Sequence, residues 1–468
     1  MTLSPEATAL AVILVGVVVL WITEALPLPV TALLGAVACV VAGVAPAEKV
    51  FQPFADPVVF LFIGSFMLAE AIRVHGLDRR LAYAVLGLPW VGEAPRRVLG
   101  AVAFVSALIS AFISNTATTA MMVAIVAGML AAIEEAAARQ PDPGGRRLEP
   151  AFATGLLLCV AFAASIGGLA TPIGTPPNII GLAFIRDTLG VELSFPGWCA
   201  IGVPLVVVLV GCAVAVLGRM FPAGVDRLPG VAALVAEERR RLGPWTAGQR
   251  STAIAFALTV TLWVLPGLLT LLLGGDRPIV GRLLARCPEG VAALIGAVAL
   301  FVLPGGPGRR ALTWAEASRI DWGIVLLYGG GMALGKLSFS TGLADAMGRG
   351  LTAWLPPGSG AWVLVGAAAL VAVITSEFTS NTASVNMVVP VAITLARSAG
   401  GDPLATALAA TFAASLGFML PVSTPCNAIV YGTGRIPLRA MLASGAVLDV
   451  IGVVVVTIAM LVVATATR

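Results

Sequence analysis

The chain has 468 residues, of which 59% are hydrophobic and 11% are charged, whereas ordinary soluble domains carry roughly 25% charged residues. This composition is that of a membrane protein, and the single histidine nearly excludes a hydrolytic triad, so no enzyme activity is expected. The net charge of +4 comes from arginines that are not interleaved with aromatic residues, so no nucleic-acid partner is expected either.

Apolar segments of about 20 residues, the length that crosses a hydrocarbon core of about 30 Å, recur along the chain. They predict an all-α polytopic membrane protein, because exposed strand edges are not tolerated in lipid. In chain order, we expect spans at 7–24, 28–46, 57–75 and 80–90, a helical hairpin at 98–134, a broken helix at 151–185 and a span at 198–220. After a polar stretch at 221–250 we expect spans at 251–273, 289–303 and 318–340, a second hairpin at 360–397, a second broken helix at 404–432 and a span at 440–465.

These elements form two similar halves. The segment VSALISAFISNTATTAMMVAI (105–125) aligns without a gap with VAVITSEFTSNTASVNMVVPV (371–391), and GGLATPIGTPPNIIG (167–181) is answered by GFMLPVSTPCNAIVYG (417–432). We therefore predict one repeat at 1–220, a cytoplasmic connector at 221–250 and a second repeat at 251–468. Polar, proline-interrupted segments at matching places in two repeats indicate the binding site of a secondary transporter.

The expected spans also predict an orientation. If the N-terminus is cytoplasmic and each hairpin enters and leaves on one side, most of the 28 basic residues lie in the cytoplasm. The protein is therefore expected in a bacterial inner membrane, with its N-terminus and its connector in the cytoplasm.

The Ser-Asn-Thr tips at 114–116 and 380–382 are the most distinctive polar features. Serine and asparagine are good N-caps, so capping of a hairpin tip could explain a single copy. Two matched copies, each followed by a Thr-Pro break in the next long helix, favour a binding site, because a break inside the membrane leaves backbone groups unpaired.

These loops offer neutral oxygen atoms, which suit a hard monovalent cation such as Na⁺. We expect one sodium ion at Ser110, Ser114, Asn115 and carbonyl groups near Gly174. We expect a second at Ser376, Ser380, Asn381 and carbonyl groups near Ser423. Proton relays need Asp, Glu or His, and the loops lack them, although Glu377 lies three residues before Ser380.

The helices that start after these loops present free N–H groups and positive dipole ends, which attract carboxylates without an arginine. Hydroxyl groups of four threonines can donate to such an anion, namely Thr116, Thr175, Thr382 and Thr424. Pro176 and Pro425 hold the breaks open. The sequence therefore predicts an anion between two cations.

On the two tips and the breaks GTPPN (174–178) and STPCN (423–427), the chain resembles the divalent anion/sodium symporter family, the di- and tricarboxylate transporters. The resemblance covers nearly the whole chain. It implies two inverted-topology repeats, about 11 transmembrane helices plus two re-entrant hairpins and two broken helices, a homodimer joined through a scaffold domain, and an elevator-type movement.

By the same resemblance, the sodium sites fall on the two residue sets named above. Substrate contact falls on Asn115, Thr116, Asn381, Thr382, Thr424 and Pro425, with Thr175 and Pro176 adjacent. Ser423 and Cys426 stand where the first break has Gly174 and Pro177, so the second cation site could be tuned differently.

The short connector leaves no room for the soluble domains of some sulfate-transporting relatives, which favours C4-dicarboxylates such as succinate, fumarate or malate. The alternatives are a sodium-independent dicarboxylate exchanger and a transporter of sulfate, another oxyanion or citrate with the same fold. An ion antiporter of related architecture would require Glu377 for proton coupling. Glu70, Lys336, Glu377 and Asp449 lie in or near apolar segments, and structural pairing or snorkelling to the membrane interface is the favoured role for each.

Overall fold

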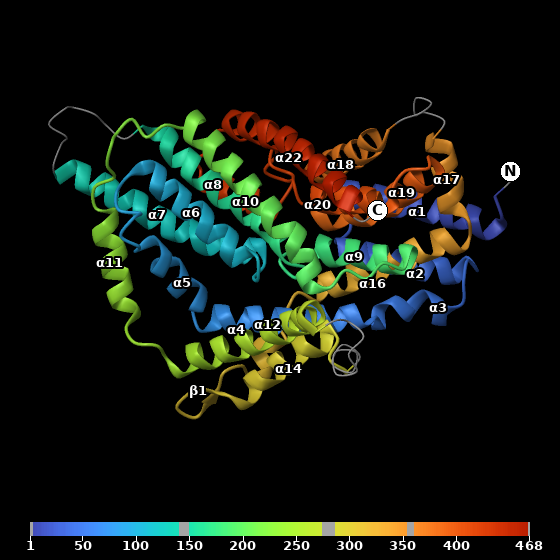
Figure 1. The fold of residues 1–468 in the computed structure, drawn as a ribbon, viewed down its shortest axis with the longest axis horizontal. Coiled ribbons are helices and arrows are strands. Elements are labelled where there is room, and N and C mark those ends of the chain that lie inside the picture. The colour runs from blue at the N-terminus through green and yellow to red at the C-terminus, as the bar shows by residue number, and fades with distance from the viewer. Residues whose placement is uncertain (1–2, 140–148, 274–285, 353–359, 467–468) are drawn as a thin grey trace.

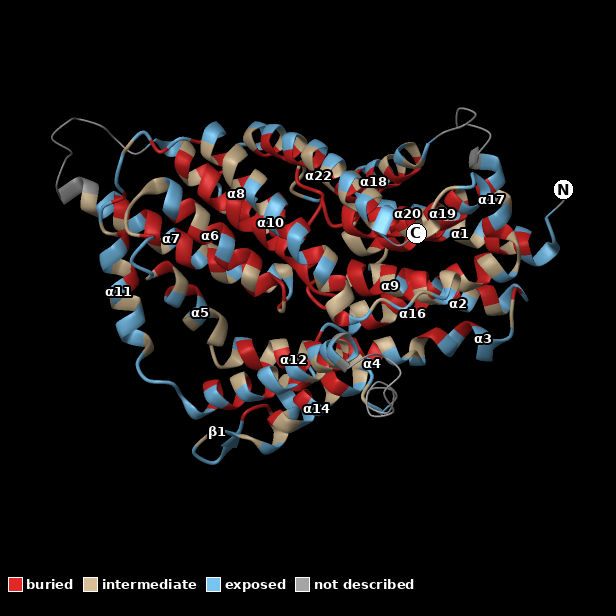
Figure 2. Ribbon diagram, viewed as in Figure 1, coloured by how far each residue is buried: buried red, intermediate tan, exposed pale blue. Residues whose placement is uncertain are grey.

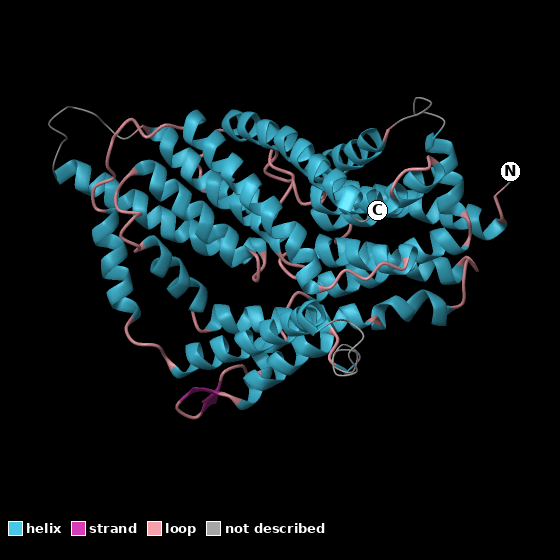
Figure 3. Ribbon diagram, viewed as in Figure 1, coloured by secondary structure: helices cyan, strands magenta, loops and turns pink. Residues whose placement is uncertain are grey.

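The computed structural model describes residues 3–139, 149–273, 286–352 and 360–466. The described chain is helical except for one two-stranded antiparallel hairpin, β1 with β2 (Figure 3). The all-α polytopic architecture expected from the sequence is therefore confirmed. In the first half the elements are α1 (Pro5–Thr23), α2 (Leu28–Val41), α3 (Ala47–Phe51), η1 (Gln52–Ala55), α4 (Pro57–Val74), α5 (Leu77–Leu86), α6 (Pro95–Ser110), α7 (Asn115–Arg139), α8 (Pro150–Gly167), η2 (Gly168–Ala170), α9 (Pro176–Leu189) and α10 (Phe195–Met220).

The second half follows the connector helix α11 and repeats the order of the long elements. Its elements, with α11, are α11 (Val231–Leu242), α12 (Ala247–Leu273), α14 (Glu289–Val302), β1 (Pro304–Gly306), β2 (Arg309–Arg310), α15 (Trp314–Ala317), α16 (Trp322–Ser340), α17 (Leu343–Thr352), α18 (Ala361–Phe378), α19 (Asn381–Ser398), α20 (Pro403–Ala413), α21 (Pro425–Tyr431) and α22 (Leu438–Ala466). Helices α12, α14 and α16 correspond to α1, α2 and α4. The hairpin α18–α19, the broken helix α20–α21 and α22 correspond to α6–α7, α8–α9 and α10.

The packing of these helices exchanges partners between the halves. Helix α4 packs mainly on α14, and α16 packs mainly on α2, so each half supplies the neighbour that the other half lacks. Within the halves, α6 packs on α8 and α18 packs on α20 (Figure 1). Between the halves, α10 packs on α22. Such reciprocal pairing is what a two-fold relation between repeats produces.

The surface of the long helices is suited to lipid. Every residue of α8 from Thr154 to Gly167 is buried, as Figure 2 shows along this helix. Helix α22 instead exposes an apolar stripe at helical spacing, formed by Val447, Val450, Val454, Ile458 and Val462. Nine described helices are long and apolar enough to cross a membrane, so an apolar exposed stripe is an expected lipid contact.

Many of these helices begin with a capping residue followed by proline. Ser4, Asp56, Ser194 and Asp402 each accept a hydrogen bond from a backbone N–H in the first turn. Proline is favoured at the first helical position because its missing N–H would have no partner there. These local signals explain why the spans start where the sequence predicts them.

The span expected at 80–90 is wrong. That region contains α5, which has ten residues, or about 15 Å of helix, and it carries Asp78, Arg79 and Arg80 on its first turn. A helix so short and polar cannot cross the hydrocarbon core. Ten crossings remain, close to the expected eleven, if each broken helix counts once.

Loss of that span changes the orientation. Five crossings now separate the N-terminus from α11, and Figure 1 shows the two at opposite ends of the molecule. The sequence predicted that the N-terminus and the connector both lie in the cytoplasm. An odd number of crossings between them does not allow this.

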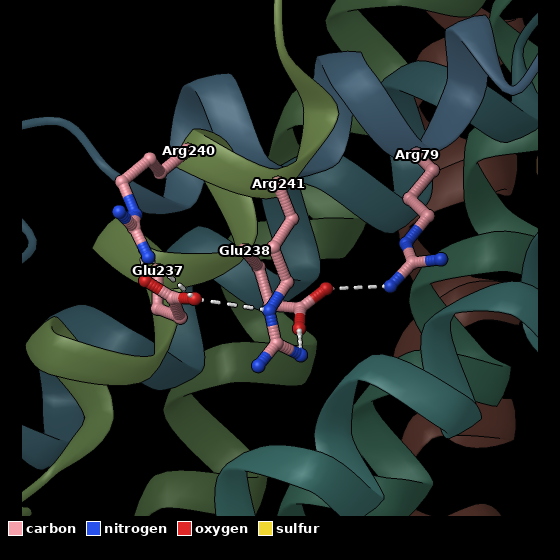
Figure 4. Close-up of polar contacts among 5 residues, drawn as sticks. All are labelled: Arg79, Glu237, Glu238, Arg240 and Arg241. Atoms are coloured by element: carbon pink, nitrogen blue, oxygen red, sulfur yellow. Dashed lines mark hydrogen bonds and ion pairs between the residues drawn. The ribbon is translucent and has the colours of Figure 1, made fainter.

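The connector helix α11 is held to α5 by charged side chains (Figure 4). Glu238 accepts from Arg79 of α5 at 2.6 Å and from Arg241 at 3.1 Å. Hydrogen bonds from Arg240 and then Arg241 lower the pKa of Glu237 from its ordinary value. The connector predicted at 221–250 thus contains a helix that is docked on the first half.

Candidate functional site

The two hairpin tips have the same geometry. In the first, the Ser110 hydroxyl donates to Asn115 Oδ1 at 2.6 Å, and in the second the Ser376 hydroxyl donates to Asn381 Oδ1, also at 2.6 Å. Ser110 and Ser376 are fully buried. The structure therefore brings together the serine and the asparagine that the sequence analysis assigned to one sodium site in each tip.

The remaining tip serines cap helices. Ser114 accepts from Ala117 N–H at 3.3 Å at the start of α7, and Ser380 accepts from Ala383 N–H at 3.1 Å at the start of α19. A serine oxygen has two lone pairs, so capping leaves capacity for a cation. The capping and the cation-binding interpretations are compatible.

Each break is held by an asparagine that follows its Thr-Pro pair. Asn178 donates to Gly168 O and to Thr171 O, both at 2.8 Å. Asn427 donates to the corresponding carbonyl groups, Gly417 O at 3.1 Å and Leu420 O at 3.0 Å. Both side chains are fully buried, so each fixes the path of the unwound backbone.

Sequence reasoning quoted these asparagines but gave them no role. The signal was present, because Asn stands three residues after the threonine in both GTPPN and STPCN. A donor amide that satisfies two carbonyl groups is what an interrupted helix requires.

The first break lies directly against the first tip. A β-carbon on Gly168 would come within 2.5 Å of Asn115 Oδ1, and one on Gly174 would collide with Gly168 O and approach Ala111 O to 3.0 Å. The Thr171 hydroxyl also donates to Ala111 O. The carbonyl groups of Gly168 and Ala111 therefore lie beside Gly174, and Asn115, which is bonded to Ser110, lies beside Gly168.

The second break lies against the second tip in the same way, but it has Ser423 where the first break has Gly174. A β-carbon on Gly417 would be 3.3 Å from Ser376 Oγ and 3.3 Å from Ser423 Cβ. The Ser376 hydroxyl also donates to Ala414 O at 2.8 Å. The structure thus brings Ser376, Asn381 and Ser423 together, as the second sodium set requires.

Glu377 also lies at this second set, although the sequence analysis did not include it among the sodium ligands. Its carboxylate accepts from the Ser423 hydroxyl at 2.5 Å and from Leu420 N–H at 3.0 Å. The side chain is 4% exposed. The available signal was its place beside Ser376, but only the folded chain brings it to the break.

The helices after the breaks start as predicted. Pro176 opens α9 and Pro425 opens α21, with Thr175 and Thr424 extended in the N-cap positions. Thr424 caps its helix by accepting from Asn427 N–H at 3.1 Å, whereas Thr175 makes no capping hydrogen bond. Both threonines are buried, while Thr116 at the first tip is exposed and Thr382 at the second is half-buried.

Contacts between the halves join the four loops. Helix α7 packs on α21 and α19 packs on α9, so each hairpin touches the second part of the broken helix from the other half. Cys426 of α21 lies against Thr119 and Ser165 of the first half. The residues predicted for the substrate therefore lie on elements that meet in one region.

Two of the other ionisable residues flagged in the sequence, Lys336 and Glu70, form ion pairs. Lys336 binds Asp187 at 2.8 Å, and Glu70 binds Arg73 at 2.5 Å. A cavity of about 380 Å³ lies beside Lys336, lined also by Asp187, Arg397 and Ser340. It is separate from the tips and breaks, and none of its lining residues was predicted to bind substrate.

The chain matches the family model described as "Sodium:sulfate symporter transmembrane region" over residues 1–465. It is 32% identical over 463 residues to the "Sodium-dependent dicarboxylate transporter SdcS" of Staphylococcus saprophyticus, covering 97% of this chain and 86% of that protein. It is 31% identical over 448 residues to the protein of the same name from Staphylococcus aureus strain USA300, covering 93% of this chain and 82% of that protein.

Two solved structures have a similar fold. The YdaH transporter of Alcanivorax borkumensis matches with a TM-score of 0.55 at 15% identity, covering 88% of this chain and 85% of that one. The MtrF protein of Neisseria gonorrhoeae matches with a TM-score of 0.56 at 13% identity, covering 88% and 82%. At such identities the likeness concerns the fold alone.

Proposed function

Because the chain belongs to the sodium:sulfate symporter family, that of the divalent anion/sodium symporters, and is a transporter and not an enzyme, we propose that it couples sodium to the uptake of C4-dicarboxylates. Succinate, fumarate and malate are the proposed substrates. The observation that carries the proposal is the matched pair of neutral oxygen sets, one at each hairpin tip and its break.

Each oxygen set suits a sodium ion. The first combines Ser110, Ser114 and Asn115 with carbonyl groups around Gly174, and the second uses Ser376, Ser380, Asn381 and Ser423. Unwound carbonyl groups and side-chain oxygens coordinate sodium in repeats of this kind. The donors are uncharged in the first set, which disfavours a proton relay there.

The dianion binds between the two sets. The N-termini of α9 and α21 direct positive dipole ends and free N–H groups at it, while Thr175, Thr424 and the tip threonines Thr116 and Thr382 supply hydroxyl donors. The tips (110–116, 376–382) and the breaks (168–176, 414–425) contain no basic residue. Two sodium ions and one dianion form a neutral load, which lowers the cost of moving the charges through a low-dielectric region.

Movement of the load is proposed to follow an elevator mechanism. The two hairpins, the two broken helices, α10 and α22 form the moving body, and α1, α2, α4, α12, α14 and α16 form the scaffold. Gly331 and Gly335 of α16 lie so close to Asn386 and Phe184 of the moving body that a β-carbon on either would collide with them. Glycine at both positions gives α16 a smooth face for sliding.

Ion pairs cross the same boundary. Arg186 of α9 binds Asp56 at 2.7 Å, and Asp187 binds Lys336 of α16 at 2.8 Å. Translation of the moving body breaks these pairs, so they stabilise the conformation seen here. The homodimer implied by the family resemblance, joined through the scaffold helices, stays a prediction.

We further propose that the end of the molecule with α11 faces the cytoplasm and that the N-terminus lies outside. Basic residues mark the cytoplasmic side of bacterial membrane proteins. At the α11 end the described basic residues are Arg73, Arg79, Arg80, Arg96, Arg97, Arg139, Arg219, Arg227, Arg239, Arg240, Arg241, Arg250, Arg309, Arg310, Arg319, Arg435 and Arg439. At the other end they are Lys49, Arg186, Arg286, Lys336, Arg349 and Arg397.

Uptake by purified protein in liposomes tests the transport proposal. An inward sodium gradient is expected to drive labelled succinate uptake, and an equal potassium gradient is not. Counterflow of succinate in sodium-free buffer would indicate an exchanger instead. Competition by unlabelled sulfate or citrate that exceeds competition by fumarate would reject C4-dicarboxylates as the substrate class.

A further inference from the structure

The two breaks differ in how their backbone N–H groups are satisfied. In the first break, residues Gly168–Ala170 continue α8 as the 3₁₀ turn η2. In the second break, α20 ends at Ala413, and residues 414–424, all of them described, form no helix. Unwound backbone at membrane depth needs other hydrogen-bond partners.

In the second break, acidic side chains are the hydrogen-bond partners of the unwound backbone. Three consecutive backbone N–H groups donate to carboxylates. Phe418 N–H donates to Asp449 Oδ1 at 3.3 Å. Met419 N–H donates to Glu377 Oε1 at 2.8 Å, and Leu420 N–H donates to Glu377 Oε2 at 3.0 Å. Hydrogen bonds to a charged acceptor are roughly twice as strong as neutral ones.

Glu377 also touches both parts of the second sodium set. It follows Ser376 in the chain, at the end of α18, and its carboxylate accepts from the Ser423 hydroxyl at 2.5 Å. A buried carboxylate in this place adds a negative charge to a set whose other oxygens are neutral.

The first half has no acid at either equivalent position. In the gap-free alignment of the tips, Glu377 corresponds to Ala111. Gly202 of α10 lies against Leu169 and Ala170, and Gly445 of α22 lies against Phe418 and Met419.

These glycines are equivalent, because each lies against the same two positions of its break. Four residues after them stand Val206 in α10 and Asp449 in α22. Both acids therefore occur together in the second half, where the first half has alanine and valine.

Basic groups do not neutralise this pair. The charged and titratable residues on the helices packed against α18 and α22 are Arg219, Cys199 and Cys212 on α10, Arg397 on α19, Asp402 at the start of α20 and Arg439 on α22. None of them forms a described ion pair or hydrogen bond with Glu377 or Asp449, and Asp449 Oδ2 has no donor among the described residues. The Glu377 carboxylate, which accepts from Ser423 and two backbone N–H groups, is thus a buried charge without a basic partner, and such a charge attracts a cation.

We propose that Glu377 is a positioning residue that makes the second sodium site the tighter of the two. Its carboxylate holds the second break unwound at Met419 and Leu420, and its charge lies beside Ser376 and Ser423. Asp449 supports it by taking the N–H group of Phe418. This inference rests on the proposed sodium coupling and deepens it, because it ranks the two ions.

Thermal melting of the purified protein, titrated with sodium chloride against choline chloride at constant ionic strength and without substrate, tests the inference. Glu377→Gln keeps the shape but removes the charge and one acceptor oxygen. The sodium concentration for half-maximal stabilisation is expected to rise by about tenfold or more, because charge-assisted contacts to the site are lost.

Asp402→Asn is the matched control. Asp402 is also a carboxylate that accepts from two backbone N–H groups of the same broken helix, Leu404 at 2.9 Å and Ala405 at 3.1 Å, but it lies at the opposite end of α20. This variant is expected to lower the melting temperature while the half-maximal sodium concentration stays within about twofold.

A second pair of variants covers the case in which Glu377→Gln does not fold. Asp449→Val recreates the first-half residue and leaves Phe418 N–H unpaired, so it is expected to raise the half-maximal sodium concentration about threefold. Asp449→Asn keeps an acceptor for that N–H group and is expected to stay near the wild type.

The possible results separate the two proposals. A wild-type protein that sodium does not stabilise would reject the proposed function, and the inference with it. Sodium stabilisation in the wild type with an unchanged half-maximal concentration in Glu377→Gln, or in Asp449→Val, would overturn the inference alone.

Discussion

The two hairpin tips agree closely, whereas the two breaks beside them do not. Each tip holds its asparagine by the same 2.6 Å hydrogen bond from a serine, and each break is tied by an asparagine to the same two carbonyl positions. The first break keeps a 3₁₀ turn, while the second is unwound and bound by acids. The repeat therefore preserves the oxygen atoms proposed to bind cations, while the contacts that support the two breaks differ.

The largest expected effect comes from the shared tips. Asn115→Ala and Asn381→Ala each remove a side-chain oxygen from one proposed sodium set and break the hydrogen bond that this oxygen accepts from a buried serine. Succinate uptake at a fixed sodium gradient is expected to fall by about a hundredfold in each variant. A wild-type sodium response in both variants would contradict the assignment of the tips.

The glycines of the two breaks distinguish the halves. A β-carbon at position 168 would come within 2.5 Å of Asn115 Oδ1, whereas one at position 417 would meet its nearest atoms at 3.3 Å. Gly168→Ala is therefore expected to reduce sodium-dependent uptake by about thirtyfold, and Gly417→Ala by about threefold or less. Equal losses in the two variants would show that the breaks are packed alike after all.

The clamping asparagines are expected to behave alike in both halves. Asn178→Ala removes the side-chain donor to Gly168 O and Thr171 O, and Asn427→Ala removes the donor to Gly417 O and Leu420 O. Thr171 O and Leu420 O keep a backbone donor, so each variant is expected to destabilise the fold by about 2 kcal/mol through the one buried carbonyl group that loses its partner. The melting temperature measured without sodium should fall by a similar amount in the two variants. A loss confined to Asn178→Ala would mean that the acids can hold the second break without its clamp.

The smallest effect is expected far from both sites. Glu238→Gln removes the ion pairs of Glu238 with Arg79 of α5 and with Arg241 of its own helix. Each such pair at the surface contributes at most about 1 kcal/mol. Uptake rates and half-maximal sodium concentrations should match the wild type. A change in sodium dependence would indicate that the connector takes part in transport.

Much of this architecture could be predicted because its signals are local. The hairpins, the broken helices and the Ser110–Asn115 and Ser376–Asn381 pairs follow from short motifs that occur twice. The two members of each pair are five residues apart, on either side of the hairpin turn, so the turn brings them together. The prolines at 176 and 425 likewise mark the starts of α9 and α21 in the sequence.

Features that depend on distant contacts could not be predicted. Asp449 meets Phe418 from 31 residues away, so no local pattern connects the second break with α22. Helix α5 was mistaken for a span because apolar residues on one face of an amphipathic helix raise its average hydropathy. That single error also entered the predicted orientation, because the extra span put the N-terminus and the connector on the same side.

An experimental map of the protein in sodium and succinate tests the central claim most directly. Density for one ion is expected between Ser110, Asn115 and Gly174, and for a second between Ser376, Asn381 and Ser423. Density for the dianion is expected between the starts of α9 and α21. Succinate held instead by Lys336 and Arg397 in the neighbouring cavity, with both oxygen sets empty, would contradict the account.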